Sequence, residues 1–216
     1  MVAFYGSISP CLIMLVNYIF IPTIVEMLSH HEGYKLKSRR HKMNLLKQFL
    51  IITIASIFIP VTTNDGQISS FINYMAENDI GKFQMEMATN FMGMSDYFLK
   101  YLIQCTFLSN IIAFLDIPHK LYMFFKNRFS KYDEDIPDDW YFDLGYQYAF
   151  SISVFLMTLI FVASAPHLSI FGCLFFVMKY LVDKYNLTVM YKNEFESQGE
   201  LASSVKSYIA FSIFIF

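Results

Sequence analysis

A stripe of polar side chains lies within an apolar stretch that is long enough to cross a membrane as a helix. Asp96, Lys100 and Gln104 recur every four residues there, with Tyr97 and Tyr101 beside them. Because each residue of an α-helix turns by about 100°, these side chains lie along one side of the helix. Polar groups are costly in hydrocarbon and commonly face a partner or a water-filled cavity. The stripe could therefore contact water or ions.

Two interpretations of the stripe are open from the residues alone. In one, Asp96 and Lys100 pair near the outer interface, because an acidic residue four positions before a basic one is the favourable order on a helix. In the other, the stripe is the wall of a water-filled path. Thr106 and Asn110 lie on another side of the helix, where we expect them to hydrogen-bond to neighbouring helices.

The elements that must position these residues are membrane-spanning helices. The 216-residue chain is 56% hydrophobic, with 24 Phe and 15 Tyr against 16% charged residues, which is too apolar for an ordinary soluble domain. Apolar runs of about 20 residues alternate with charged segments, as in a polytopic membrane protein. The final run reaches the last residue, so we expect a fragment of a longer protein. We expect one all-α transmembrane bundle with spans at about 8–28, 46–61, 97–125, 144–164, 168–182 and 201–216.

Loop charge predicts how the spans are oriented, because short cytoplasmic loops are rich in Lys and Arg. The segment 30–47 is basic, the segment 62–95 is mainly acidic, and basic residues return at 120–131. The fourth and fifth spans meet at a tight turn near Pro166, on the outer side. We therefore expect the chain to start outside, and the sequon at Asn186 to lie in the cytoplasm without a glycan.

Residues that could support enzyme or metal chemistry are few. Cys11, Cys105 and Cys173 all fall inside apolar runs, with no disulfide framework and no zinc spacing. The histidines at 30–31 precede a glutamate, but adjacent residues point in different directions on a helix, and the H-E-x-x-H spacing is absent. We expect no enzymatic activity, no cofactor, no metal site and no nucleic-acid partner.

The first span carries two prolines and two polar residues that bear on its shape. Proline removes a helix hydrogen bond, so we expect kinks near Pro10 and Pro22, and kinked helices are common where membrane proteins conduct. Asn17 is a candidate to face the same path as the stripe. Glu26 lies near the cytoplasmic end, where snorkelling to the interface and a functional role are equally open.

Four segments carry a resemblance to a known family through their order and spacing. They are "IPTIVEMLSHHEGY" at 21–34, "YFLKYLIQCTFLSNIIAFLDIP" at 97–118, "FDLGYQYAF" at 142–150 and "SAPHLSIFGCLFFVMKYLVDKYNL" at 164–187. Together they resemble the OSCA and transmembrane protein 63 family of calcium-permeable, stress-gated cation channels. The matching positions in the longer two segments are Phe98, Tyr101, Phe107, Ser109, Asn110, Leu115, Pro118, Pro166, Phe171, Gly172, Lys179, Asp183 and Asn186.

The resemblance implies an anoctamin-like channel architecture in which these spans are the fourth through ninth of eleven helices. In the family the pore is bounded mainly by the third through seventh helices, and the long sixth helix is the gating element. The pore-lining candidates that follow are Tyr97, Lys100, Tyr101, Gln104, Cys105, Leu108 and Asn17, and the gating or hinge candidates are Ser109, Asn110, Pro10, Pro22 and Pro118. Ser109 stands where the family often has glycine, and Ile170 where it often has a second proline.

The function that the resemblance implies is a mechanically or osmotically gated, calcium-permeable cation channel subunit. Two other functions are open: a phospholipid scramblase of anoctamin-like architecture, and a non-conducting receptor or scaffold in which the polar residues only join helices. The expected partners are the lipid bilayer, permeating cations including calcium, and a second copy in a homodimer. We expect a multi-pass integral membrane protein, in the plasma membrane rather than an endomembrane.

Overall fold

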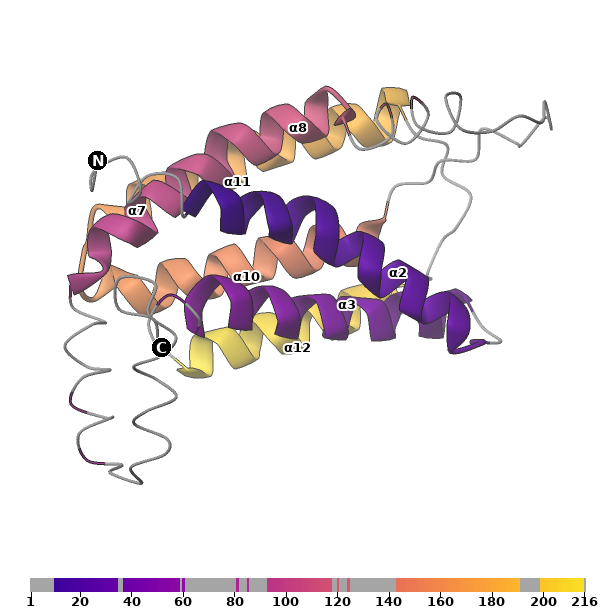
Figure 1. Ribbon diagram of the computed structural model, residues 1–216, viewed down its shortest axis with the longest axis horizontal. Coiled ribbons are helices and arrows are strands. Elements are labelled where there is room, and N and C mark those ends of the chain that lie inside the picture. Colours follow the sequence, from indigo (N-terminus) through magenta and orange to yellow (C-terminus); the bar gives the residue numbers. More distant parts are fainter. Residues whose placement is uncertain are drawn as a thin grey trace.

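The protein is a bundle of antiparallel helices. The computed structural model describes residues 10–34, 37–58, 60, 81, 85, 93–117, 120, 124, 143–190 and 199–215. All regular structure in these ranges is helical, and the long helices run back and forth along one direction (Figure 1). Among the described helices, Pro10–Ser29, Ser95–Phe114 and Leu144–Val162 are long and apolar enough to cross a membrane. The expected all-α membrane fold is confirmed.

The first membrane helix changes its winding just before a proline. A π-helical turn, η1 (Val16–Phe20), leads directly into α2 (Ile21–His31), whose second residue is Pro22. Proline has no N–H with which to bond the preceding turn, and a wider turn accommodates that loss without ending the helix. Pro10 is buried at the start of the described helix. The irregularity of this span therefore lies at 16–22, near its middle.

The second helix is longer than the apolar run from which we expected it. α3 covers Lys37–Thr53 and continues into the π-helical turn η2 (Ile54–Phe58), so the helix begins about two turns before residue 46. Lys and Arg are good helix formers, which explains why the basic segment joins the helix instead of forming a loop. The polar first turns thus extend α3 beyond its apolar part.

The third helix is built from three consecutive pieces. They are α7 (Ser95–Gln104), the π-helical turn η4 (Cys105–Ser109) and α8 (Asn110–Phe114). The helix ends where Asp116 adopts a left-handed conformation, with φ 51°, and donates its N–H to the carbonyl of Ala113 at 3.3 Å. The candidate hinge Pro118 and most of the expected span beyond residue 117 lie outside the described residues.

The last three helices include a pair that is joined by a tight turn, as expected. α10 (Leu144–Val162) and α11 (Leu168–Tyr185) are joined by 163–167, where the amide of Ala165 donates to Phe161 O and that of Leu168 to Ala165 O. α11 continues into η5 (Asn186–Met190), and α12 covers Glu200–Ile215. The turn reverses the chain within five residues, so α10 and α11 pack side by side.

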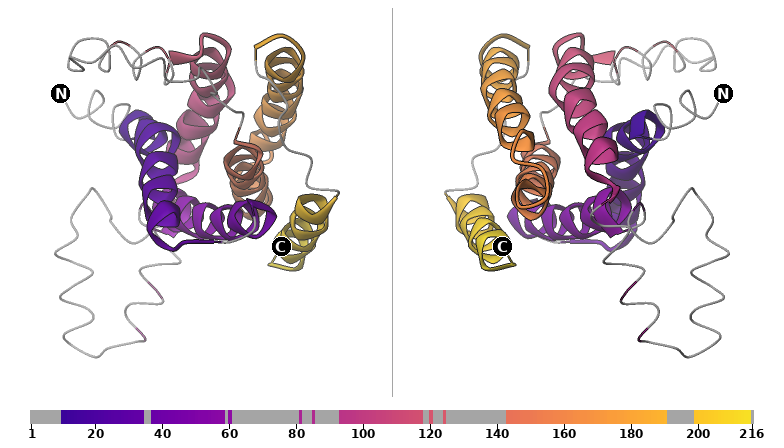
Figure 2. Two further views of the ribbon diagram at one scale, coloured as in Figure 1. Left: turned by 90° about the vertical axis from the view of Figure 1, so that its right-hand side faces the viewer. Right: turned by 90° about the vertical axis from the view of Figure 1, so that its left-hand side faces the viewer.

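α10 is the central helix of the bundle. It packs against α3, α7, α11 and α12, and the end-on views of Figure 2 show it surrounded by these neighbours. Aromatic side chains fill the core: Phe98 stacks on Phe161 at a centroid distance of 3.6 Å, and Phe150 contacts Phe175 edge-on at 6.1 Å. A second apolar cluster joins α3 and α10 to α12. The core therefore ties the described helices together through α10.

Candidate functional site

A buried hydrogen-bonded junction joins the first, third and fourth membrane helices. Asn17 Nδ2, in η1, donates to Tyr101 Oη of α7 at 3.0 Å. Tyr146 Oη of α10 donates to the backbone carbonyl of Asn17 at 3.3 Å. Asn17 is fully buried and Tyr101 is only 1% exposed. Because a hydrogen bond in hydrocarbon replaces no bond to water, the junction fixes the relative positions of three helices.

The polar stripe of the third helix is divided between two faces. Asp96 and Lys100 are exposed, and these two described residues form no ion pair with each other. Tyr101 and Cys105 point inward and are buried against the first and fourth helices. Gln104 lies between the two faces and is half-buried. The expected stripe therefore covers a sector of the helix that is wide enough to include both exposed and buried residues.

The other candidates on this helix border the buried face. Tyr97 is half-buried and packs its ring edge-on against Phe98 at 5.2 Å. Leu108 is half-buried against the main apolar core. With Gln104, these residues form the boundary between the inward and outward faces of α7 and η4.

The π-helical turn η4 is lined by side chains that bond to its own backbone. Thr106 Oγ1 donates to Leu102 O at 2.8 Å, Ser109 Oγ donates to Cys105 O, and Asn110 Nδ2 donates to Thr106 O at 2.7 Å. A π-turn disturbs the regular backbone ladder, and short polar side chains can satisfy the carbonyls that it affects. Ser109 and Asn110, the expected hinge residues, therefore lie at an actual irregularity in the helix.

Of the two residues expected to bond to neighbouring helices, only Thr106 does so among the described residues. Thr106 Oγ1 also lies 3.5 Å from the carbonyl oxygen of Phe171 in α11, as expected for a residue that joins helices. Asn110 instead donates within its own helix, while its Oδ1 is buried without a hydrogen-bond partner in the described part of the chain. The contact between α8 and η5 is made by Asn186, whose Nδ2 donates to Ala113 O at 3.3 Å.

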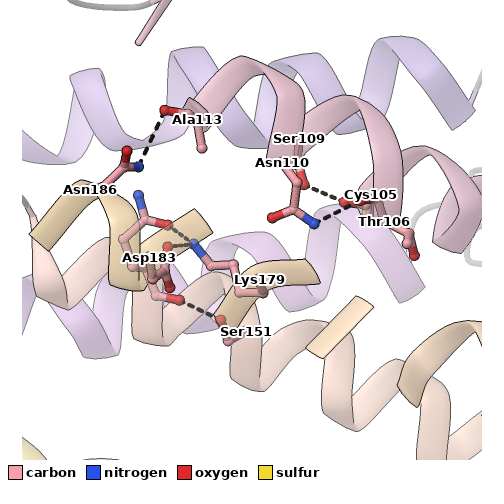
Figure 3. Close-up of polar contacts among 10 residues, drawn as sticks. Cys105, Thr106, Ser109, Asn110, Ala113, Ser151, Lys179, Asp183 and Asn186 are labelled. Atoms are coloured by element: carbon pink, nitrogen blue, oxygen red, sulfur yellow. Dashed lines mark hydrogen bonds and ion pairs between the residues drawn. The ribbon is translucent and has the colours of Figure 1, made fainter. Parts of the chain in front are cut away.

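A charged residue is buried between α10 and α11. Lys179 Nζ donates to Asp183 Oδ1 at 2.6 Å and to Gln147 Oε1 on α10. Figure 3 shows Lys179 and Asp183 beside the polar residues of η4 and α8. The sequence interpretation treated Lys179 and Asp183 as family-like positions, counted Lys179 among the basic residues after the turn, and missed this group. The available signal was a lysine in an apolar run with an acidic residue four positions later.

Polar contacts also cluster where the first two helices meet. Arg40 Nε donates to Ser29 Oγ at 2.8 Å, and its guanidinium lies 3.8 Å from the Glu26 carboxylate. Lys47 forms an ion pair with Glu32, which holds the pKa of that exposed carboxyl below its usual value. Glu26 is thus held against the basic segment of α3. The basic residues that predicted a cytoplasmic loop also help to connect the ends of two helices.

No cluster of His, Cys, Asp or Glu suited to a metal ion occurs among the described residues. The polar groups that the described residues bury along the third helix and beside it are mainly amides and hydroxyls, together with the ammonium of Lys179. Such groups can hold helices together and can contact small cations through their oxygens. The candidate site is therefore a series of buried polar contacts along the third helix: the junction at Asn17, the π-turn η4, and the Lys179 group.

Comparison with known proteins gives the family. Residues 2–216 match the family described as "Calcium-dependent channel, 7TM region, putative phosphate". The zebrafish (Danio rerio) protein named osmosensitive cation channel TMEM63C is 24% identical over 193 residues, which are 84% of this chain and 23% of that protein. The chicken (Gallus gallus) mechanosensitive cation channel TMEM63B is 23% identical over 192 residues, with the same coverage of each chain.

A plant protein shows the same similarity over a longer part of the chain. The CSC1-like protein ERD4 of Brassica juncea is 24% identical over 215 residues, covering 97% of this chain and 29% of that protein. The chain thus spans less than a third of the length of each of these relatives. Since the family match covers almost every residue, the chain belongs to the calcium-dependent channel 7TM family, which includes the OSCA and transmembrane protein 63 proteins.

Proposed function

We propose that this chain is part of a mechanically or osmotically gated, calcium-permeable cation channel subunit. The relatives' names supply the class of activity. The single observation that carries the proposal for this chain is the Asn17–Tyr101 hydrogen bond, which ties the first span to the interrupted third helix. Membrane tension that moves these two helices apart would act on that bond and on the neighbouring π-turn.

The proposed ion path follows the boundary face of the third helix. Gln104 is its polar residue, Tyr97 and Leu108 border it, and Lys100 lies beside it on the exposed face. Tyr101, Cys105 and Asn17 lie behind that face, where they set the position of the helix. We therefore assign conductance to the boundary residues, and the tension threshold to the junction behind them.

The test is patch recording of the full-length protein under graded membrane stretch. Gln104→Leu should lower single-channel conductance severalfold, because an apolar side chain replaces a polar one beside the proposed path. Phe107→Leu is the matched control. Phe107 lies on the exposed apolar side of the same helix, so this variant should leave conductance unchanged.

The junction behind the path is tested through the tension threshold. Tyr101→Phe and Asn17→Leu each break the same hydrogen bond and should shift the threshold in the same direction. Normal conductance in Gln104→Leu together with normal thresholds in both junction variants would contradict the proposal.

Calcium permeability and the lipid-scrambling alternative need separate measurements. Reversal potentials with calcium as the main external cation should remain positive enough to require calcium entry. Reconstituted vesicles with fluorescent lipids distinguish the alternative: dithionite-accessible lipid that rises without ionic current would identify scrambling instead of conduction.

A further inference from the structure

The buried ammonium of Lys179 has an environment that suits a small cation. The residue is only 5% exposed, on the face of α11 that packs against the rest of the bundle. Two oxygens accept from Nζ, one from the carboxylate of Asp183 and one from the carboxamide of Gln147 on α10. A charge within a membrane bundle is tolerated when oxygens of this kind replace its water.

A third oxygen faces the same region from the third helix. Asn110 is 2% exposed, and its Oδ1 has no hydrogen-bond partner among the described residues. Two contacts align its helix with α11: Thr106 lies against Phe171, and Asn186 bonds to Ala113. Asn110 therefore lies beside the part of α11 midway between these contacts.

Lys179 occupies that midway position. It is eight residues after Phe171 and seven before Asn186, on the same helical face. In Figure 3 the carboxamide oxygen of Asn110 is turned toward the side on which Lys179 lies. An ammonium has three N–H donors, of which Asp183 and Gln147 take two. One donor and one buried acceptor thus remain on facing helices.

We propose that Asp183, Gln147 and Asn110 form an intramembrane cation site whose resident cation is the Lys179 ammonium. The third donor of Lys179 reaches Asn110 Oδ1 through one bridging water. The ligand class of the site is a small primary ammonium. The Lys179 side chain thereby holds α10, α11 and α8 together. This inference is independent of the proposed channel function, because it concerns binding and stability.

The test removes the tethered cation and supplies a free one. In the full-length purified protein, Lys179→Ala leaves the three oxygens without their ammonium and should lower the unfolding temperature. Methylammonium chloride should raise the unfolding temperature of this variant by about 1 °C at roughly ten times its dissociation constant, because a ligand that binds only the folded state stabilises it and a long protein has a large unfolding entropy. Tetramethylammonium chloride at equal concentration has no N–H donor and should have no such effect.

Matched variants separate a cation site from general effects of salt. Lys179→Met fills the space without a charge, so neither it nor the unmodified protein should respond to methylammonium. Adding Asp183→Asn to Lys179→Ala should abolish the response, because the site loses its negative charge. Equal responses to the two salts, or a response that persists in the double variant, would overturn the proposal.

The proposal remains testable if Lys179→Ala is too unstable to purify. The fraction of monodisperse protein is then measured after detergent extraction of the membranes in each of the two salts. Recovery in methylammonium alone, and its loss when Asp183→Asn is added, is the expected result. Equal recovery in both salts, or no recovery in either, would contradict the site.

Discussion

Individual polar residues in this bundle bond chiefly to backbone carbonyls and to one another. Thr106, Ser109 and Asn110 donate to carbonyls four residues earlier, and Asn17 joins two tyrosines from other helices. Such bonds are worth only about 0.6 kcal/mol each on average within membranes, so their main effect is to select one arrangement of the helices. The polar residues therefore define positions more than they add stability.

Asp143 is a residue whose two roles oppose each other. Its carboxylate caps the start of α10 by accepting from the amide of Tyr146 at 3.2 Å, while burial raises the pKa of that carboxyl. Asp143→Ala should lower the free energy of unfolding by about 1 kcal/mol, because the cap is lost. Asp143→Asn keeps a capping oxygen and removes a half-buried charge, so it should be neutral or stabilising. Chemical unfolding of the purified protein at neutral pH measures both.

The pH dependence of these variants gives an independent check. A carboxyl with a raised folded-state pKa contributes most stability below its unfolded pKa and loses that contribution as the pH rises through the folded value. The difference between the unmodified protein and Asp143→Asn should therefore shift in favour of the variant as the pH rises. If Asp143→Asn is as unstable as Asp143→Ala at every pH, then the hydrogen bond to the amide of Tyr146 is not how Asp143 stabilises the fold.

At the scale of helices, sequence patterns predicted that the membrane helices exist and in which order, but not the irregular turns inside them. Apolar run length identified the helices around Asn17, Tyr101 and Tyr146, because the membrane fixes how long an apolar helix must be. The four π-helical turns among the described residues could not be predicted from periodicity, since one extra residue per turn changes the pattern less than the scatter of side-chain types.

The sequence predicts which side of a helix carries the candidate residues, but it does not predict which residues they contact. Asp96, Lys100 and Tyr101 share a broad sector, and only the packed neighbours decide which of them is buried. The partner of Lys179 on its own helix follows from an i, i+4 spacing, whereas Gln147 is 32 residues away in sequence. Contacts between helices depend on rotation and register, which a single sequence does not specify.

Gly172 sets how closely α10 and α11 approach. A Cβ atom at this position would lie 2.6 Å from Cγ2 of Thr158, whose hydroxyl is fixed by donating to Val154 O at 2.7 Å. Gly172→Ala should therefore lower the free energy of unfolding by about 1–3 kcal/mol, the usual cost of overpacking. Thr158→Ser removes the clashing methyl group, so the double variant should regain most of the loss. Thermal unfolding of the purified variants measures this.

A matched control exists on another helix. Gly93 has no atom within 4 Å of its added Cβ, so Gly93→Ala should leave unfolding unchanged or slightly improve it. If Gly172→Ala and Gly93→Ala behave alike, close packing between α10 and α11 is not what requires glycine at position 172.

At the scale of the whole molecule, the helix directions alternate as loop charge predicted. The junction of α2 and α3, the end of α8, the start of α10 and the end of α11 lie at one end of the bundle, and the α10–α11 turn lies at the other (Figure 1). The start of α10 lies beside the start of α3, because a Cβ atom added at Gly145 would lie 3.3 Å from the carbonyl oxygen of His41. The basic first turns of α3 and Lys184 in the last turn of α11 therefore lie at the same end of the bundle, as required if that end is cytoplasmic.

This arrangement predicts opposite accessibility for two exposed residues. In a background without the native cysteines, Lys42→Cys tests the basic end and His167→Cys tests the α10–α11 turn. After digitonin opens only the plasma membrane, an impermeant maleimide should label Lys42→Cys from the cytosol. His167→Cys should be labelled either on intact cells or only after all membranes are dissolved, depending on the compartment. Loop charge predicts which side of the membrane each residue faces, and the helix directions place the two residues at opposite ends of the bundle. Labelling of both variants from one side would contradict both.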